Sequence, residues 1–250
     1  MLRQFFTKLK ENTVELNYGR DIIATWARDY SRGKTSLKVL DIGMGSGTDL
    51  TRIRSKIKQS ADIEVHLTGL DNYAPNVAIA TKHGIEAKSC DIERDKFPYA
   101  DQSLDIVVAN QVVEHTKEIF WIYSEISRVL KPDGIIITGV PNLASFHNRV
   151  GLAFGMQPTS IEVMGPHVRG FTAKSFINFL EADGYFKNIS VKGSNFYPFP
   201  AFISKYLSRF FPKASVAIFL LTQRTDKHGL YKDVLQTRFF ETSYFIGKDA

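Results

Sequence analysis

One stretch, from Val39 to Thr48, constrains the fold of this chain more than any other. Val39, Leu40 and Ile42 favour a strand that contains the acid Asp41 near its end. Glycines then stand at positions 43, 45 and 47, where they let the backbone turn tightly before the helix-compatible run 49–58. A strand, a glycine loop and a helix in this order predict an open α/β sheet that binds a nucleotide at the carboxyl end of its strands.

The spacing of the glycines selects among nucleotides. The dinucleotide fingerprint G-x-G-x-x-G needs a glycine at position 48, where this chain has Thr48, and the Gly-Lys pair of a P-loop is absent. Asp41 would also stand close to a phosphate anion, and like charges repel. S-adenosylmethionine suits the acid better, because it offers a sulfonium and an ammonium and carries no phosphate. A glycine-rich turn without a ligand is the alternative interpretation.

Composition limits the class of protein. The 250 residues, 44% hydrophobic and 23% charged, predict one globular domain with additions. The single cysteine, Cys90, excludes an intramolecular disulfide. No stretch reads as a membrane span or a signal peptide, so we expect a cytoplasmic protein. The formal charge of +6 favours anionic partners: phosphorylated or nucleotide-linked substrates, nucleic acid or an acidic membrane face.

Acids also mark the strands that follow. Asp71 ends the predicted strand 63–70, where a carboxylate can accept hydrogen bonds from both ribose hydroxyls of a nucleotide. Asp91 follows the predicted strand 85–90, and an aspartate there is by itself typical of a turn. Because Asp41 and Asp71 also stand at the ends of strands, we expect Asp91 to contact the ligand as well.

The remaining pattern alternates strands and helices. The apolar run 104–109 predicts a strand buried on both faces, and 135–140 and the pair 189–192 and 215–222 complete the predicted strands. Helices are expected over 74–83, 119–130 and 171–182. This alternation predicts a doubly wound α/β sheet with right-handed crossovers and helices on both faces.

An acid followed by G-x-G-x-G, and the stretch Leu130–Gly134 before an apolar strand, resemble the class I (Rossmann-like) S-adenosylmethionine-dependent methyltransferases. The resemblance covers residues 37–224 and implies a seven-stranded, mostly parallel sheet with an antiparallel last strand. It implies S-adenosyl-L-methionine as the cofactor, with the adenine amine at Asp91 and the adenine ring at the amide of Ile92. The cofactor-binding residues implied in full are Asp41, Gly43, Gly45, Gly47, Asp71, Asn72, Asp91, Ile92 and Asn110.

Within that class the chain resembles the small-molecule branch, which includes quinone-biosynthesis and surface-polysaccharide methyltransferases. The tract from Pro141 to Thr172 carries this likeness. It implies methyl transfer to a small polar acceptor, foremost O-methylation of a sugar or related metabolite that is nucleotide- or lipid-linked. A nucleic-acid methyltransferase is the alternative, although Asn110–Val113 lacks the Asn/Asp-Pro-Pro-aromatic motif of base-methylating enzymes. A non-catalytic member that binds the cofactor is a third interpretation.

The irregular segment 141–170 is expected to form a lid or substrate loop. A hydroxyl acceptor benefits from a base, and the candidates are His167, His115, Glu114 and His147. His167 with Arg169 suits an anionic or sugar acceptor, so His167, His115 and Arg169 are the predicted catalytic residues. No metal site is assigned from the sequence.

Three additions flank or interrupt this domain. Residues 1–36 are expected to form a helical cover over one edge of the sheet, and 225–250 a C-terminal extension with an edge strand at 244–246. The insertion 194–213 contains an amphipathic helix over 201–211. Its apolar side either packs on its own sheet or on a second subunit of a homodimer, or lies with residues 1–10 on an acidic membrane as a peripheral anchor.

Overall fold

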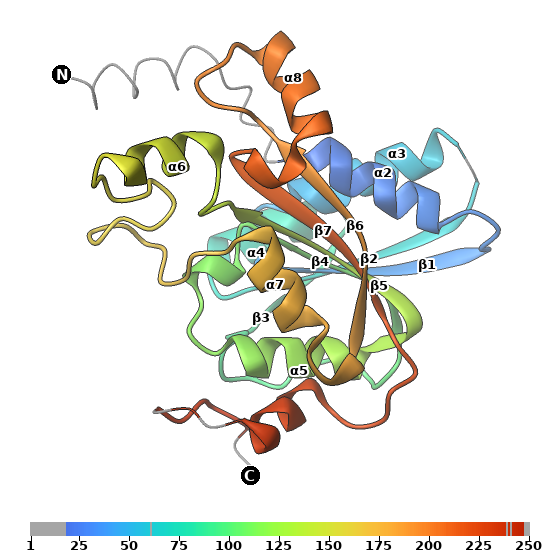
Figure 1. Cartoon of the computed structure of the whole chain (residues 1–250). Coiled ribbons are helices and arrows are strands. Elements are labelled where there is room, and N and C mark those ends of the chain that lie inside the picture. The colour runs from blue at the N-terminus through green and yellow to red at the C-terminus, as the bar shows by residue number, and fades with distance from the viewer. Residues whose placement is uncertain (1–18, 61, 239, 241, 248–250) are drawn as a thin grey trace.

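The structure, a computed structural model, describes residues 19–60, 62–238, 240 and 242–247. A seven-stranded sheet runs through its middle (Figure 1). The strands are β1 Ser36–Ile42, β2 Glu64–Asp71, β3 Glu86–Ser89, β4 Leu104–Asn110, β5 Leu130–Pro141, β6 Phe186–Ser194 and β7 Ala217–Arg224. The helices are α2 Arg20–Tyr30, α3 Thr48–Lys58, α4 Ala74–Lys82, α5 Ile119–Val129, α6 Phe146–Ala153, α7 Ala173–Leu180 and α8 Ala201–Phe210, with 3-10 turns η1 Val113–His115, η2 Ala182–Gly184, η3 Pro212–Ala214 and η4 Tyr231–Thr237.

The strand order, β3-β2-β1-β4-β5-β7-β6, confirms the predicted doubly wound fold. β7 is antiparallel to both of its neighbours, and the pairs among β1 to β5 are parallel. The chain order reverses between β1 and β4. Ligands of open α/β sheets bind at such a switch point, outside the carboxyl ends of the strands.

Two apolar cores, one on each face of the sheet, hold these layers together. In β4, Ile106 and Val108 pack in the core that contains residues of α2 and α3, whereas Val107 and Ala109 pack in the core of α5 and α7. Because successive side chains of a strand point to opposite faces, the uninterrupted apolar run of β4 is what a central strand between two helical layers requires.

The N-terminal cover differs from the expectation. α2 lies over a face of the sheet and not along an edge, because buried Ile23, Trp26 and Ala27 join the same core as Val39 of β1 and Phe219 of β7. Residues 1–10, the second predicted membrane anchor, lie outside the described residues.

The C-terminal segment also differs. The predicted edge strand at 244–246 is wrong: these residues are irregular. Tyr244 packs on Phe120 and Phe245 on Trp121, with ring centroids 4.8 and 5.2 Å apart, so the aromatic side chains are covered by α5 and not by strand pairing.

The predicted lid 141–170 is not wholly irregular, since it contains the short helix α6. Over the ranges that the structure describes, no helix combines the length and the apolarity needed to cross a bilayer.

Candidate functional site

The glycine loop between β1 and α3 adopts the turn that its sequence predicts. Gly43, Gly45 and Gly47 have φ values of 62°, 55° and 81°, in the left-handed region that favours glycine. A Cβ at Gly47 would lie 2.3 Å from Ile85 Cδ1, whereas a Cβ at Gly45 would meet nothing within 4 Å. Gly47 is therefore needed for packing, and Gly45 borders open space at the end of β1.

Asp71 at the end of β2 braces this loop. Its Oδ2 accepts hydrogen bonds from the Gly45 amide (2.9 Å) and from Asn76 Nδ2 (3.2 Å), and its Oδ1 accepts one from the Tyr73 amide (2.8 Å). A carboxylate has about four acceptor positions, so capacity remains for a ribose hydroxyl. Asn72, the next residue, is exposed. Asp71 thus braces the glycine loop, and its predicted contact with a ribose stays a prediction.

Three carboxyl groups, those of Asp41, Asp49 and Asp71, gather beneath the loop. Asp41 is buried, and burial together with the nearby Asp49 and Asp71 carboxylates holds its pKa well above the usual range. Asp49 pairs with Arg20 Nε at 3.0 Å and accepts a hydrogen bond from Asn110 Nδ2 at 2.8 Å. Such a site favours a cation over a phosphate.

Asp49 and Arg20 were missed by the sequence analysis. Asp49 stands in the first turn of α3, a common place for an acid, and its position after the glycine loop was the only signal in the sequence. Arg20 comes from α2, before the first strand, and the sequence does not reveal that α2 lies against α3.

The loop after β3 carries Asp91 and Ile92. Asp91 Oδ1 accepts a hydrogen bond from the Glu93 amide (2.9 Å), while the Asp91 amide donates to Asp95 Oδ2 (3.0 Å). Asp91 is exposed and Ile92 is half-buried against the core of α5. Asp91 therefore orders its own turn, and its predicted contact with adenine stays a prediction.

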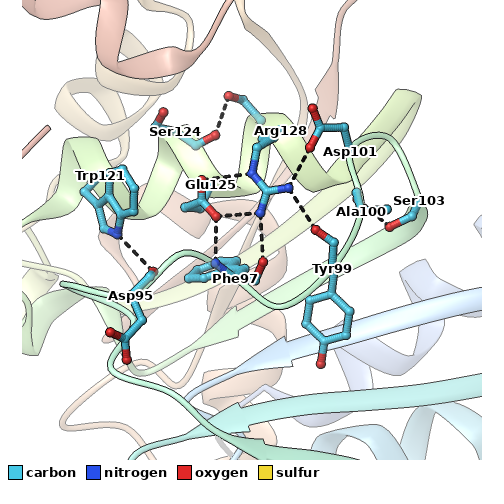
Figure 2. Close-up of polar contacts among 11 residues, drawn as sticks. Asp95, Phe97, Tyr99, Ala100, Asp101, Ser103, Trp121, Ser124, Glu125 and Arg128 are labelled. Atoms are coloured by element: carbon cyan, nitrogen blue, oxygen red, sulfur yellow. Dashed lines mark hydrogen bonds and ion pairs between the residues drawn. The ribbon is translucent and has the colours of Figure 1, made fainter. Parts of the chain in front are cut away.

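A buried ion-pair network attaches the rest of this loop to α5 (Figure 2). Arg128 donates to both oxygens of Glu125, at 2.9 and 2.6 Å, and to Asp101 at 2.7 Å. It also donates to the carbonyls of Phe97 and Tyr99, and the Phe97 amide donates to Glu125 Oε2 at 2.7 Å. The network fixes the segment that follows Asp91 and Ile92, and so the shape of that side of the site.

A second group of residues meets beyond the end of β4. Glu114 in η1 is buried, and neither carboxylate oxygen has a hydrogen-bond partner among the described residues. Burial raises the pKa of Glu114 to about 7. His115 and His167, far apart in the sequence, lie with ring centroids 4.7 Å apart, and His115 Nε2 is 4.0 Å from Glu114 Oε1.

Backbone carbonyls orient both histidines. His115 Nδ1 lies 3.2 Å from the Pro166 carbonyl and His167 Nδ1 lies 2.9 Å from the Ser160 carbonyl. Because a carbonyl only accepts, each Nδ1 carries the hydrogen, and each neutral ring keeps a lone pair on Nε2. The structure thus brings two basic nitrogens and a buried carboxyl together beyond the carboxyl end of β4, the parallel neighbour of β1.

The other predicted residues of the lid have different surroundings. Arg169 donates from Nε to the Thr116 carbonyl (3.1 Å) and from Nη2 to the Lys117 carbonyl (2.5 Å). These bonds tie the lid to the segment after η1 and thereby hold His167 in place, so here Arg169 is a positioning residue; its predicted contact with the acceptor stays a prediction. His147 lies apart from the histidine pair and bonds Thr159 Oγ1 at 3.0 Å.

Comparison with known proteins identifies a known domain in part of this chain. Residues 40–138 match the family described as "Methyltransferase domain". The mouse mitochondrial ubiquinone biosynthesis O-methyltransferase is 27% identical over 167 residues, which cover 62% of this chain and 43% of the relative. Demethylmenaquinone methyltransferase of Chlorobaculum parvum is 33% identical over 118 residues, or 47% of this chain and 46% of the relative. The chain thus spans less than half the length of these two curated relatives.

A solved structure agrees on the fold. An S-adenosylmethionine-dependent methyltransferase from Archaeoglobus fulgidus superposes with a TM-score of 0.54 at 16% identity, covering 82% of this chain and 94% of the other. Residues 40–138 thus match a methyltransferase domain, and the chain has the fold of an S-adenosylmethionine-dependent methyltransferase.

Proposed function

We propose that this chain transfers the methyl group of S-adenosylmethionine to a hydroxyl of a small polar acceptor. The observation that carries the proposal is the contact of His115 with His167, each with its Nδ1 at a backbone carbonyl, beyond the carboxyl end of β4, the parallel neighbour of β1. When bound, S-adenosylmethionine supplies an electrophilic methyl carbon.

The residues of the site fit the parts of that cofactor. Asp71 would accept the ribose hydroxyls, and Asp91 and the Ile92 amide would meet the adenine. The carboxyl groups of Asp41 and Asp49 would lie near the cationic methionine end, whose charge would favour their ionised form, and open space above Gly45 provides room.

The histidine pair would receive the acceptor. Methyl transfer is an in-line displacement, so holding the acceptor oxygen close to the methyl carbon supplies much of the rate enhancement. A neutral imidazole with its lone pair on Nε2 can take the hydroxyl proton as the oxygen becomes bonded to carbon. His115 is exposed and reachable from solvent, and His167 lies on the lid that would cover the acceptor.

For the acceptor we propose a sugar or related metabolite carried on a lipid or a nucleotide. The lid 141–170 combines Arg149 and His167 with apolar side chains left in solvent, among them Phe154 and Met164. Polar groups suit the sugar, and the apolar ones suit a lipid carrier. A quinol is the second candidate, because one curated relative cited above is named for ubiquinone biosynthesis and the other for demethylmenaquinone.

Calorimetry and a turnover screen test the proposal. The full chain should bind S-adenosylmethionine, and labelled cofactor should label a lipid-linked or nucleotide-linked sugar in preference to a demethylated quinol or RNA. His115→Ala and His167→Ala should slow turnover at least tenfold while cofactor binding persists, and His147→Ala should not. If neither substitution slows turnover, the histidine pair does not serve the reaction; labelling of RNA alone would contradict the acceptor class.

We further propose that α8 makes peripheral contact with an anionic membrane face. The expectation that its apolar side packs on its own sheet is wrong: Phe202, Tyr206 and Phe210 are 70%, 64% and 71% exposed. The buried side holds Ser204, whose Oγ donates to the carbonyls of Phe196 and Phe199. These bonds fix the helix with its aromatic rings outward.

The surroundings of α8 support a lipid surface as the occupant. Lys205 and Arg209 flank the exposed rings and can meet anionic headgroups. Phe146 at the start of α6 stacks on Phe196, in the segment that precedes α8, with ring centroids 5.9 Å apart. Figure 1 shows both helices at the same end of the molecule.

Liposome co-sedimentation tests this contact. The full chain should sediment with anionic vesicles at low salt, and the double substitution Phe202→Ser/Phe210→Ser should abolish this co-sedimentation. The control Ile79→Ser, which removes an exposed apolar side chain on α4, should not. A wild type that stays in the supernatant contradicts the proposal. If the wild-type chain is instead a dimer and the Phe202→Ser/Phe210→Ser variant is a monomer, α8 forms the interface of a homodimer.

A further inference from the structure

We propose that Glu114, His115 and His167 together bind a divalent transition-metal ion such as Zn²⁺. One carboxylate oxygen and the two imidazole nitrogens lie within 4.8 Å of one another. Two of the three residues come from η1 and the third from the lid, so an ion here would join the lid to the end of β4.

The orientation of the histidines is that of metal ligands. Each Nδ1 donates to a backbone carbonyl, that of Pro166 or of Ser160. A ligand histidine almost always donates its other N–H in this way, because the bond fixes the ring and turns the lone pair of Nε2 toward the metal. Both rings thus present the nitrogen that a metal needs.

The surroundings of Glu114 are an independent observation in favour of a bound metal ion. Its side chain is 1% exposed, and neither oxygen meets a donor among the described residues. A buried carboxyl group without a partner is costly, and buried charges in proteins are usually paired or coordinate a metal. A cation between Glu114 and the two imidazoles would give this carboxylate the partner that the described residues do not provide.

The donor set indicates the class of ion. Ca²⁺ and Mg²⁺ prefer sites built from oxygen alone, whereas two imidazoles and one carboxylate suit Zn²⁺, Co²⁺ and Fe²⁺. Metal–ligand bonds of about 2.0–2.2 Å place tetrahedral ligands roughly 3.4 Å apart, so atoms that now lie within 4.8 Å must close by up to about 1.4 Å on binding. The exposed side chain of His115 has room for that adjustment.

The role of the ion rests on the proposed methyl transfer. Three protein ligands leave a fourth position open for the hydroxyl of the acceptor, and a Lewis acid lowers the pKa of a bound hydroxyl. Because the ion would occupy both Nε2 lone pairs, it would replace the imidazole as the group that activates the hydroxyl. The O–H bond then breaks and its proton passes to solvent. The oxygen forms the new bond to the methyl carbon as the S–C bond breaks, and the electron pair of that bond stays on sulfur.

Cobalt provides a readout that is separate from catalysis. The full chain, treated with a chelator and dialysed, is titrated with Co²⁺ while visible absorption is followed, and Zn²⁺ displacement is measured by calorimetry. One Co²⁺ per chain should bind and produce ligand-field bands. His115→Ala, His167→Ala and Glu114→Gln should each weaken binding at least tenfold, whereas the lid control His147→Ala should bind as the wild type does.

Two results would overturn the inference: no stoichiometric uptake by the wild type, or uptake that both His115→Ala and His167→Ala leave unchanged. Cofactor binding and turnover are measured on the same samples. If the metal-free chain binds S-adenosylmethionine and turns over fully, the metal's role fails and the proposed function stands. If the chain does not bind the cofactor, the proposed function fails, whatever the cobalt titration shows.

Discussion

Removing the guanidinium of Arg128 should destabilise the protein severely. The side chains of Arg128 and Glu125 are 6% and 3% exposed, so Arg128→Ala would leave the Glu125 carboxylate buried with only the Phe97 amide as donor. Breaking a buried ion pair by removing one partner costs about 3–5 kcal/mol. That is a large share of the roughly 5–15 kcal/mol by which a domain is stable.

Urea unfolding followed by circular dichroism measures the loss. The midpoint should fall at an unchanged m-value, because the amount of surface exposed on unfolding stays the same. The matched control is Arg52→Ala, which removes an arginine paired with Asp21 at 2.7 Å on the surface. Exposed pairs contribute about 0–1 kcal/mol, so the control should lose little.

The free energies of unfolding of the two variants are compared to test whether burial makes the Arg128 network important for stability. If Arg128→Ala is no less stable than Arg52→Ala, burial does not make the Arg128 network important and the reasoning fails. Because the network also holds the segment after Asp91, Arg128→Ala should weaken S-adenosylmethionine binding in calorimetry, whereas Arg52→Ala should not.

Two further predictions concern the acids of the cofactor site. Asp71→Ala should weaken S-adenosylmethionine binding about tenfold to a hundredfold, because leaving two ribose hydroxyls unpaired costs roughly 1.5–3 kcal/mol; unchanged affinity in calorimetry would contradict the ribose contact. For Asp41, burial raises the folded-state pKa above the unfolded one, so its contribution to stability is lost as pH rises through the folded pKa. Cofactor-free Asp41→Asn should therefore be more stable than the wild type in urea at neutral pH and above, with the difference shrinking toward pH 4; parallel pH profiles would refute this.

Much of the fold follows from the conformational and burial preferences of residues that are neighbours in the sequence. Positive φ angles at Gly43, Gly45 and Gly47 are a backbone requirement that glycine meets, so the loop is readable without a structure. The apolar run of β4 and the acids at the strand ends are equally local, and their repetition along the chain determines a doubly wound sheet. The position of Asp71 beside the loop follows from that topology.

Contacts between distant segments were decided by the tertiary structure alone. The sequence named His115 and His167 as separate candidates, but no periodicity predicts that they meet, because the path of an irregular lid depends on bonds such as those from Arg169 to the carbonyls of Thr116 and Lys117. The sequence showed equally that α8 is amphipathic. Which side is buried depends on what covers it, and the carbonyls that accept from Ser204 turn the aromatic side outward.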